Sequence, residues 1–119
     1  MDARMHLSPA QGSQPQDPGA EHYRVAAEVL GLLADRTRLA LLRALAESEA
    51  DVTSLAGAVD AARPAVSQHL ARLRMSGLVT TRKEGRRVIY ALTDGHLQRL
   101  IAEALEVADH RLTGRAPHA

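Results

Sequence analysis

The stretch RPAVSQHLARLRMSGLVTTRKEGRRVIYAL, residues 63–92, decides the fold because the spacing of its apolar residues changes partway along it. In its first half, Val66, Leu70 and Leu73 lie at positions i, i+4 and i+7, which places them on one face of a helix. We therefore predict a helix over residues 63–76 whose apolar stripe faces a core.

The second half of the stretch predicts a β-hairpin. The helix before it is bounded at both ends: Pro64 suits its first turn, and Gly77 stands where a helix-stopping glycine is expected. The residues that follow, 78–92, are rich in β-branched side chains on both sides of Glu84-Gly85. A two-residue link of this type favours a tight hairpin turn.

Helical spacing continues on both sides of this stretch. A first helix is predicted over residues 21–34, and Asp35 can cap a second one. A short helix over residues 53–59, capped by Thr53 or Asp51, leads through a tight link into the helix 63–76, and the two form a helix-turn-helix. A final helix, which Thr93 can cap, is predicted from Asp94 to about Leu112. The predicted fold class is mainly α with a small β-hairpin, a winged helix-turn-helix.

The amino-acid composition limits the kinds of site and function that the chain can have. The chain has 119 residues with no Phe, Trp or Cys, so the core is aliphatic, and a disulfide, a thiolate metal site and a cysteine nucleophile are excluded. No apolar run approaches the length of a membrane span, and we expect a cytoplasmic protein. We expect a flexible N-terminal tail (1–20), a DNA-binding and dimerisation domain (21–112) and a C-terminal tail (113–119).

Basic residues gather in the deciding stretch although the net charge is only +1. Seven basic residues and one acid, Glu84, lie between Arg63 and Arg87. Ser67, Gln68 and Arg72 lie on the outer side of the helix 63–76, where they suit entry into a DNA major groove. The candidate DNA-binding residues are Arg63, Pro64, Ser67, Gln68, Arg72, Arg74, Arg82, Lys83, Arg86 and Arg87. His69 borders the apolar stripe, so half-buried packing is the expected role.

Three segments carry a family resemblance. LADRTRLALLRAL, VTSLAGAVDAARPAVSQHLARLRMSGLV and RKEGRRVIYAL resemble the ArsR/SmtB family of metal-sensing transcriptional repressors, and the match covers roughly residues 26–112. The resemblance implies a homodimer formed through the first and last helices. It also implies binding to an inverted-repeat DNA operator, with release when an effector binds.

Histidines on the final helix suggest a site shared between two chains. His96, Glu103 and His110 lie on one stripe at spacings of seven residues. His96 and His110 are about 21 Å apart along the helix, so they cannot share a metal within one chain. If two copies pair antiparallel near Glu103, His96 meets His110 of the partner subunit.

The family resemblance implies a metal site on this helix, built from an Asp-x-His at its start and two ligands near its end. Asp94 and His96 match the first pair, and His110 matches the last ligand. The remaining position is Val107, which cannot bind metal, so a four-ligand zinc site is in doubt.

Nitrogen and oxygen ligands from the N-terminal segment would favour nickel or cobalt over zinc. His22 and His6 are the candidates, and the resemblance implies such recruitment in the family's nickel and cobalt sensors.

Simpler roles stay open for these residues. Asp94 can act through the helix dipole alone, and His22 can be an ordinary surface histidine. A DNA-binding module regulated by a partner protein or a small effector is the alternative function. An enzyme is not expected, because no nucleophile–base pair or phosphate-binding loop is evident.

Overall fold

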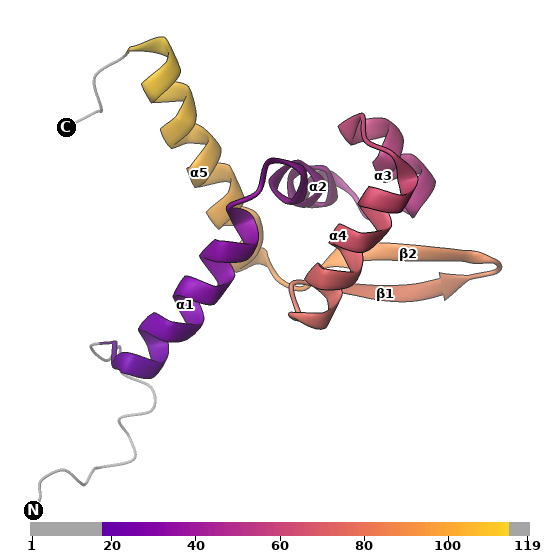
Figure 1. The fold of residues 1–119 in the computed structure, drawn as a ribbon, viewed down its shortest axis with the longest axis horizontal. Coiled ribbons are helices and arrows are strands. Elements are labelled where there is room, and N and C mark those ends of the chain that lie inside the picture. The colour runs from indigo at the N-terminus through magenta and orange to yellow at the C-terminus, as the bar shows by residue number, and fades with distance from the viewer. Residues whose placement is uncertain (1–17, 115–119) are drawn as a thin grey trace, which may run out of the picture. The chain divides into compact units, whose positions relative to one another are not determined.

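The computed structural model describes residues 18–114, which form five helices and one antiparallel hairpin (Figure 1). The predicted class, mainly α with a small β-hairpin, is confirmed. No helix in residues 18–114 is long and apolar enough to cross a membrane. The elements are α1 (Ala20–Leu33), α2 (Arg36–Glu47), α3 (Val52–Val59), α4 (Arg63–Met75), β1 (Val79–Glu84), β2 (Arg87–Leu92) and α5 (Gly95–Thr113).

The chain divides into two units between Gly31 and Leu32. In the first unit, α1 carries ion pairs from Arg24 to Glu21 and Glu28, three and four residues away. Pairs at this spacing lie on one helix face and stabilise the helix modestly. Apolar side chains on this helix remain exposed, namely Tyr23, Val25 and Leu30.

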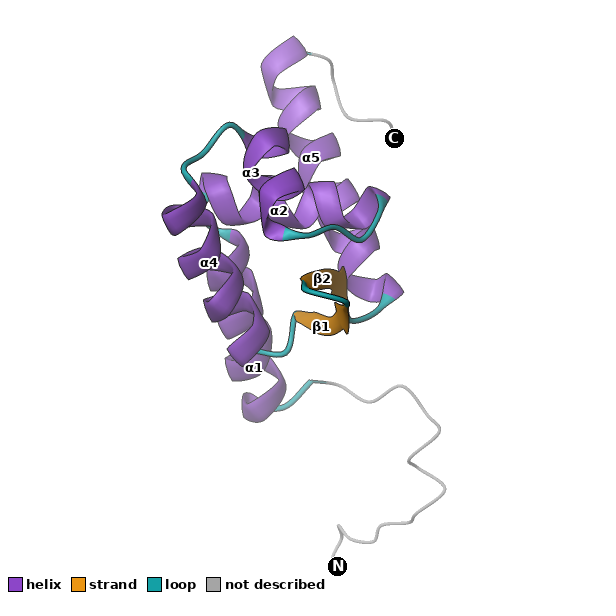
Figure 2. Cartoon of the chain, turned by 90° about the vertical axis from the view of Figure 1, so that its right-hand side faces the viewer, coloured by secondary structure: helices purple, strands orange, loops and turns teal. Residues whose placement is uncertain are grey.

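The second unit holds the aliphatic core. Helices α2, α3, α4 and α5 and the hairpin each contribute at least one buried side chain, and α2 packs against α3, α4, α5 and β2. Figure 2 shows β1 and β2 beside α2 and α4, two of the helices that contact them. The fully buried members of the core are Leu41, Leu42, Leu55, Val66, Leu70, Leu73, Val79 and Ile101.

Aspartates begin three of the helices. Asp35, Asp51 and Asp94 are the N-caps of α2, α3 and α5, and each side chain accepts a hydrogen bond from the backbone amide three residues later. Such caps satisfy amides that have no partner within the helix. The prediction that Thr93 caps the last helix is wrong, because its hydroxyl instead donates to the Gly77 carbonyl, 2.6 Å away.

The hairpin turn is displaced by one residue from its predicted place. Glu84 pairs with Arg87, so the two-residue turn is Gly85-Arg86 rather than Glu84-Gly85. Gly85 has φ +64°, and a glycine at the first turn position is typical of type II′ hairpins. The predicted glycine stop after α4 is confirmed, since Gly77 has φ +81° and Leu78 donates back to the Leu73 carbonyl.

A backbone bridge joins the hairpin to the segment before α3. Ala50 and Tyr90 exchange hydrogen bonds of 3.1 and 2.8 Å in an isolated antiparallel bridge. The sequence predicted no strand at Ala50, since a single residue carries no alternating pattern. The bridge fixes the base of the hairpin against the loop between α2 and α3.

Leu70→Ala should destabilise the fold by about 2–5 kcal/mol, because Leu70 is fully buried and its loss leaves a cavity. Urea denaturation followed by circular dichroism measures the change. Met75→Ala is the control on the same helix: Met75 is 89% exposed, so its replacement should change the unfolding free energy by less than about 0.5 kcal/mol. Equal effects of the two changes would contradict this account of the core.

Candidate functional site

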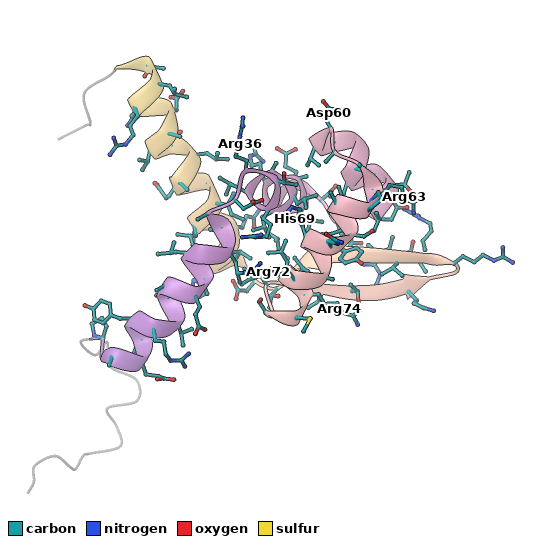
Figure 3. All side chains as sticks on the ribbon, in the orientation of Figure 1. Arg36, Asp60, Arg63, His69, Arg72 and Arg74 are labelled. Carbon is teal, nitrogen blue, oxygen red and sulfur yellow. The ribbon has the colours of Figure 1, made fainter. Side chains whose placement is uncertain are left out.

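The outer face of α4 is free of the core. Val66, Leu70 and Leu73 are fully buried, and this packing turns the opposite side of the helix toward solvent. Figure 3 labels residues along this helix, from Arg63 at its start to Arg72 and Arg74 near its end. The sequence-predicted residues Arg63, Pro64, Ser67, Gln68, Arg72 and Arg74 are all exposed.

Two of the basic residues of the hairpin are engaged within the protein. A guanidinium nitrogen of Arg82 lies 2.6 Å from Glu49 and 2.8 Å from Glu84. Arg87 donates from Nε to Asp51, 2.9 Å away. The pairs with Glu49 and Asp51 join the hairpin to the segment that leads into α3. Their charges are partly neutralised, so Arg82 and Arg87 are weaker candidates for a phosphate contact than the sequence suggests.

The other basic residues of the stretch have no carboxylate partner among residues 18–114. Two of them, Arg63 from α4 and Arg86 from the turn, line a shallow cavity of about 250 Å³ together with Asp51 and Arg87. The cavity lies where the starts of α3 and α4 meet the hairpin, and its rim carries more positive than negative charge. The unpaired basic residues are Arg63, Arg72, Arg74, Lys83 and Arg86.

Asp51 combines two structural roles. Its carboxylate accepts a hydrogen bond from the Ser54 amide and also pairs with Arg87. The hydrogen bond from Ser54, followed by the contact with Arg87, lowers the pKa of Asp51 to about 2. Arg82 similarly lowers the pKa of Glu49. Sequence reasoning missed both acids as supports of the hairpin, because only the fold brings residues 49–51 next to residues 82–87.

His69 is half-buried, as predicted, and lies between two charged groups. Its Nδ1 is 3.5 Å from a guanidinium nitrogen of Arg38, and its Nε2 is 3.9 Å from a carboxylate oxygen of Asp35. Both partners belong to the start of α2. The pKa of Asp35 is lowered, mainly by its hydrogen bond from the Arg38 amide.

The candidate metal ligands at the start of α5 already have partners within the chain. Asp94 accepts a hydrogen bond from the Leu97 amide through Oδ1. His96 Nδ1 lies 2.8 Å from a guanidinium nitrogen of Arg99, which can only donate, so Nδ1 accepts and the ring proton lies on Nε2. Metal binding at either nitrogen of His96 therefore requires the contact with Arg99 to break.

The remaining candidate ligands are His110 on α5, His22 on α1 and His6. His110 is half-buried, with Nε2 3.9 Å from Glu106. His22, in the first unit, accepts from the Gly19 amide at 3.4 Å through Nδ1. His6 lies outside the described residues. Within residues 18–114 of one chain, no three metal-binding side chains come together.

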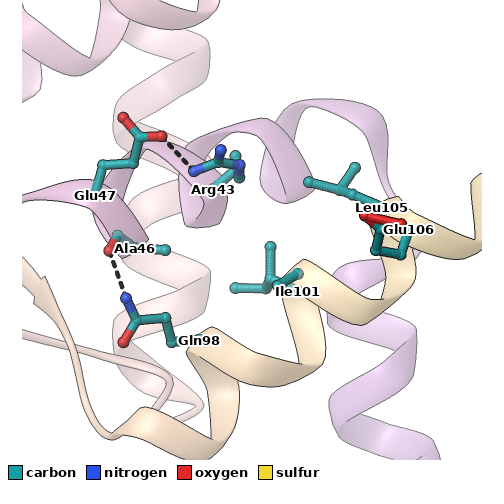
Figure 4. Close-up of a pocket in the computed structure, with 8 residues that line it drawn as sticks. Arg43, Ala46, Glu47, Gln98, Ile101, Leu105 and Glu106 are labelled. Atoms are coloured by element: carbon teal, nitrogen blue, oxygen red, sulfur yellow. Dashed lines mark hydrogen bonds and ion pairs between the residues drawn. The ribbon is translucent and has the colours of Figure 1, made fainter. Parts of the chain in front are cut away.

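A groove lies between α2 and α5 (Figure 4). Its volume is about 470 Å³, and Ile101 and Leu105 give it an apolar floor. Gln98 crosses one end by donating to the Ala46 carbonyl near the end of α2, 2.8 Å away. Arg43, Glu47 and Glu106 add charges of both signs around the groove.

Comparison with known proteins identifies similar chains. Residues 35–81 match the family model for bacterial regulatory proteins of the arsR family. The HTH-type transcriptional regulator KmtR of Mycobacterium tuberculosis is 43% identical over 91 residues, which are 76% of this chain and 70% of that protein.

Solved structures extend the similarity to almost the whole chain. A homodimeric winged helix-turn-helix DNA-binding domain from Mycobacterium bovis is 32% identical, with a TM-score of 0.73 over 90% of this chain and 99% of that one. The antimony-specific transcriptional repressor AntR is 29% identical, with a TM-score of 0.74 over 92% of this chain and 98% of that one.

Asp51→Asn should lower the melting temperature above pH 4 and have little effect near pH 2. The folded pKa of about 2 is below the usual 3.8, so the charge of Asp51 stabilises the fold above pH 3.8 and loses this effect as the pH falls toward 2. Asparagine can still cap α3 but cannot pair with Arg87. Melting curves from pH 2 to 6 measure the difference. Asp60→Asn is the control, and a constant difference between wild type and Asp51→Asn across this range would contradict the assignment.

Proposed function

Because this chain belongs to the ArsR/SmtB family of bacterial transcriptional regulators, we propose that it is a DNA-binding repressor that acts as a homodimer on an inverted-repeat operator. The exposed face of α4, flanked by unpaired arginines, is the observation that carries this proposal. The relatives are transcriptional regulators, which agrees with the expectation that the chain is not an enzyme. It would act in the cytoplasm, where the chromosome of a bacterium lies.

On this proposal α4 is the recognition helix. Ser67 and Gln68 would contact base edges or phosphates in the major groove, since both can donate and accept hydrogen bonds. Arg72 and Arg74 would bind the phosphate backbone. Lys83 and Arg86, beside the hairpin turn, would reach an adjacent groove. The basic residues proposed to contact DNA are therefore ones without a carboxylate partner among residues 18–114.

Exposed apolar surface supports the homodimer. In the first unit, Tyr23 on α1 is 66% exposed, and in the second unit Val107 and Leu112 on α5 are 56% and 87% exposed. Exposed apolar side chains of this size on each of the two helices are compatible with burial in an interface. A two-fold symmetric dimer would place two recognition helices about one DNA turn apart, which matches an inverted repeat.

We further propose that a metal ion bound between two copies of α5 regulates the affinity for DNA. The ligands would be Asp94 and His96 of one chain and His110 of the partner subunit, since the distance between the two histidines excludes a site within one chain. Nitrogen and oxygen donors without any cysteine suit nickel or cobalt, with zinc as the alternative. His22 and His6 are candidates to complete the ligand set, because Val107 offers no donor atom.

Thermodynamic linkage would connect the two sites. If the metal-bound dimer favours an arrangement with lower affinity for DNA, DNA must equally lower the affinity for metal, typically by about 1–3 kcal/mol. Two contacts of this chain would affect the metal affinity itself. Breaking the contact between His96 and Arg99 costs binding energy, and the cap from Asp94 ties the site to the start of α5.

A second candidate regulator is a small molecule bound in the groove between α2 and α5. The groove volume of about 470 Å³ lies in the range of ligand pockets, and its apolar floor with charged walls suits an amphipathic compound. A partner protein bound to the exposed part of α5 would serve the same regulatory purpose. In either case the response would not depend on His96 and His110.

Arg72→Ala should weaken DNA binding and flatten its dependence on salt, because each lost phosphate contact removes about one unit from the slope of log K against log[salt], or about two per dimer. Fluorescence anisotropy with a duplex selected by the protein from a random library measures both quantities. Arg43→Ala, an exposed arginine of α2 paired with Glu47, is the control and should leave the slope unchanged. An unchanged slope for Arg72→Ala would remove Arg72 from the interface.

His110→Ala should abolish tight metal binding while leaving the affinity of the metal-free protein for DNA unchanged, because the proposed site loses one of its imidazoles. Isothermal titration of the dimer with nickel, cobalt and zinc measures affinity and stoichiometry, which we expect to be one metal per chain. His118→Ala replaces a histidine outside the proposed ligand set and serves as the control. Metal binding that survives in His110→Ala would favour a small molecule or a partner protein as the regulator.

A further inference from the structure

Arg38 is the only charged side chain of residues 18–114 that is buried, with an exposed fraction of 9%. Burial of a guanidinium is costly unless its donors find acceptors. The DNA-binding role proposed above makes no use of this residue.

The contacts of Arg38 reach three elements. Its Nε donates to the Leu32 carbonyl in the last turn of α1, 2.7 Å away. Its backbone amide donates to Asp35, the cap of its own helix, at 3.0 Å. A terminal guanidinium nitrogen lies 3.5 Å from Nδ1 of His69 on α4. The Arg38 side chain therefore links the corner between α1 and α2 to the proposed recognition helix.

The donor and the acceptor in the contact between Arg38 and His69 can be assigned. A guanidinium can only donate, so Nδ1 of His69 accepts and the ring proton lies on Nε2. Nε2 faces the carboxylate of Asp35, 3.9 Å away. The ring thus lies between a donor at 3.5 Å and a carboxylate at 3.9 Å, both from the start of α2, and the two groups favour one orientation of the ring.

This contact adds what apolar packing cannot supply. The buried stripe of α4 holds the helix against the core, but apolar packing is non-directional and tolerates small rotations and shifts along the axis. A hydrogen bond depends steeply on distance and angle. His69 follows Gln68 directly and precedes Arg72 by three residues, so a shift of His69 displaces the side chains proposed to contact DNA.

We propose that Arg38 and His69 are positioning residues that set the orientation of α4 and thereby the discrimination between operator and other DNA. Neither residue touches DNA on this proposal. The proposal rests on the proposed function, since it assumes that α4 reads DNA. Its signature is a loss of discrimination without the change in salt dependence that loss of a phosphate contact produces.

The test replaces the acceptor on His69 in two ways. His69→Leu removes it, whereas His69→Asn retains a carbonyl oxygen near the place of Nδ1. Anisotropy titrations measure the affinity for the selected duplex and for a scrambled duplex, at a temperature where melting curves show each variant to be folded. We expect His69→Leu to lower the ratio of the two affinities about tenfold with little change in salt slope, and His69→Asn to remain close to wild type.

A double-mutant cycle with Arg38→Lys tests whether the two residues act together. Lysine keeps the charge but loses the planar fork that spans Leu32 and His69. If the contact positions α4, the loss of discrimination in the double variant will be smaller than the product of the two single losses. Arg36→Ala, an exposed arginine of α2, is the matched control and should leave discrimination unchanged.

The possible failures are distinguishable. If the wild-type protein selects no duplex from the library, the proposed function fails. If the wild type discriminates and folded His69→Leu discriminates equally well, the proposed function stands and the positioning role is overturned. A flattened salt slope in His69→Leu, with discrimination retained, would instead make His69 a direct phosphate contact and would also overturn the proposal.

Discussion

The packing of one side of α4 determines the rest of the arrangement. Val66, Leu70 and Leu73 are fully buried against α2, α3 and the hairpin, so the helix can present only its opposite side to solvent. That side carries Ser67, Gln68 and Arg72. In a chain without Phe or Trp, the buried core consists of leucine, valine and isoleucine side chains. The helical period of 3.6 residues therefore places the buried apolar side chains on one side of α4 and the exposed polar side chains on the other.

Electrostatics divides the basic residues into two groups with different roles. Arg82 pairs with Glu84 within the hairpin and with Glu49 outside it, and Arg87 pairs with Asp51. The pairs with Glu49 and Asp51 connect the hairpin to the start of α3. The pairs are exposed, so each contributes little to stability alone. Their effect is geometric, because two pairs and the bridge between Ala50 and Tyr90 restrict the hairpin at three places. The arginines left unpaired then lie at fixed positions relative to α4, and a site for a polyanion gains from such preorganisation.

Local sequence patterns predicted most of the helices and strands. They could not predict contacts between residues that are distant in the sequence. Helix spacing, the stop at Gly77 and the exposed face of α4 depend on neighbours within a few residues, and the structure confirms them. The predicted turn lies one residue from the observed Gly85-Arg86, because moving the turn by one residue shifts the strand pairing by two. Each side chain then stays on the same face, so the alternating pattern fits both turns. The contacts of Arg87 with Asp51 and of Arg38 with His69 span 36 and 31 residues. No spacing rule predicts such pairs before the fold is known.

Helix α5 carries apolar side chains that the rest of residues 18–114 leaves exposed. Leu97 and Ile101 in its first half are buried, whereas Val107 and Leu112 in its second half are exposed, so the apolar side of the helix extends beyond the core of its own chain. The candidate ligands follow the same division, with His96 beside the buried half and His110 beside the exposed half. Because about 21 Å separates them along the helix, a second copy must supply the missing donor if they bind metal. The same surface would then bury apolar side chains and assemble the site, so that dimerisation and metal binding stabilise each other.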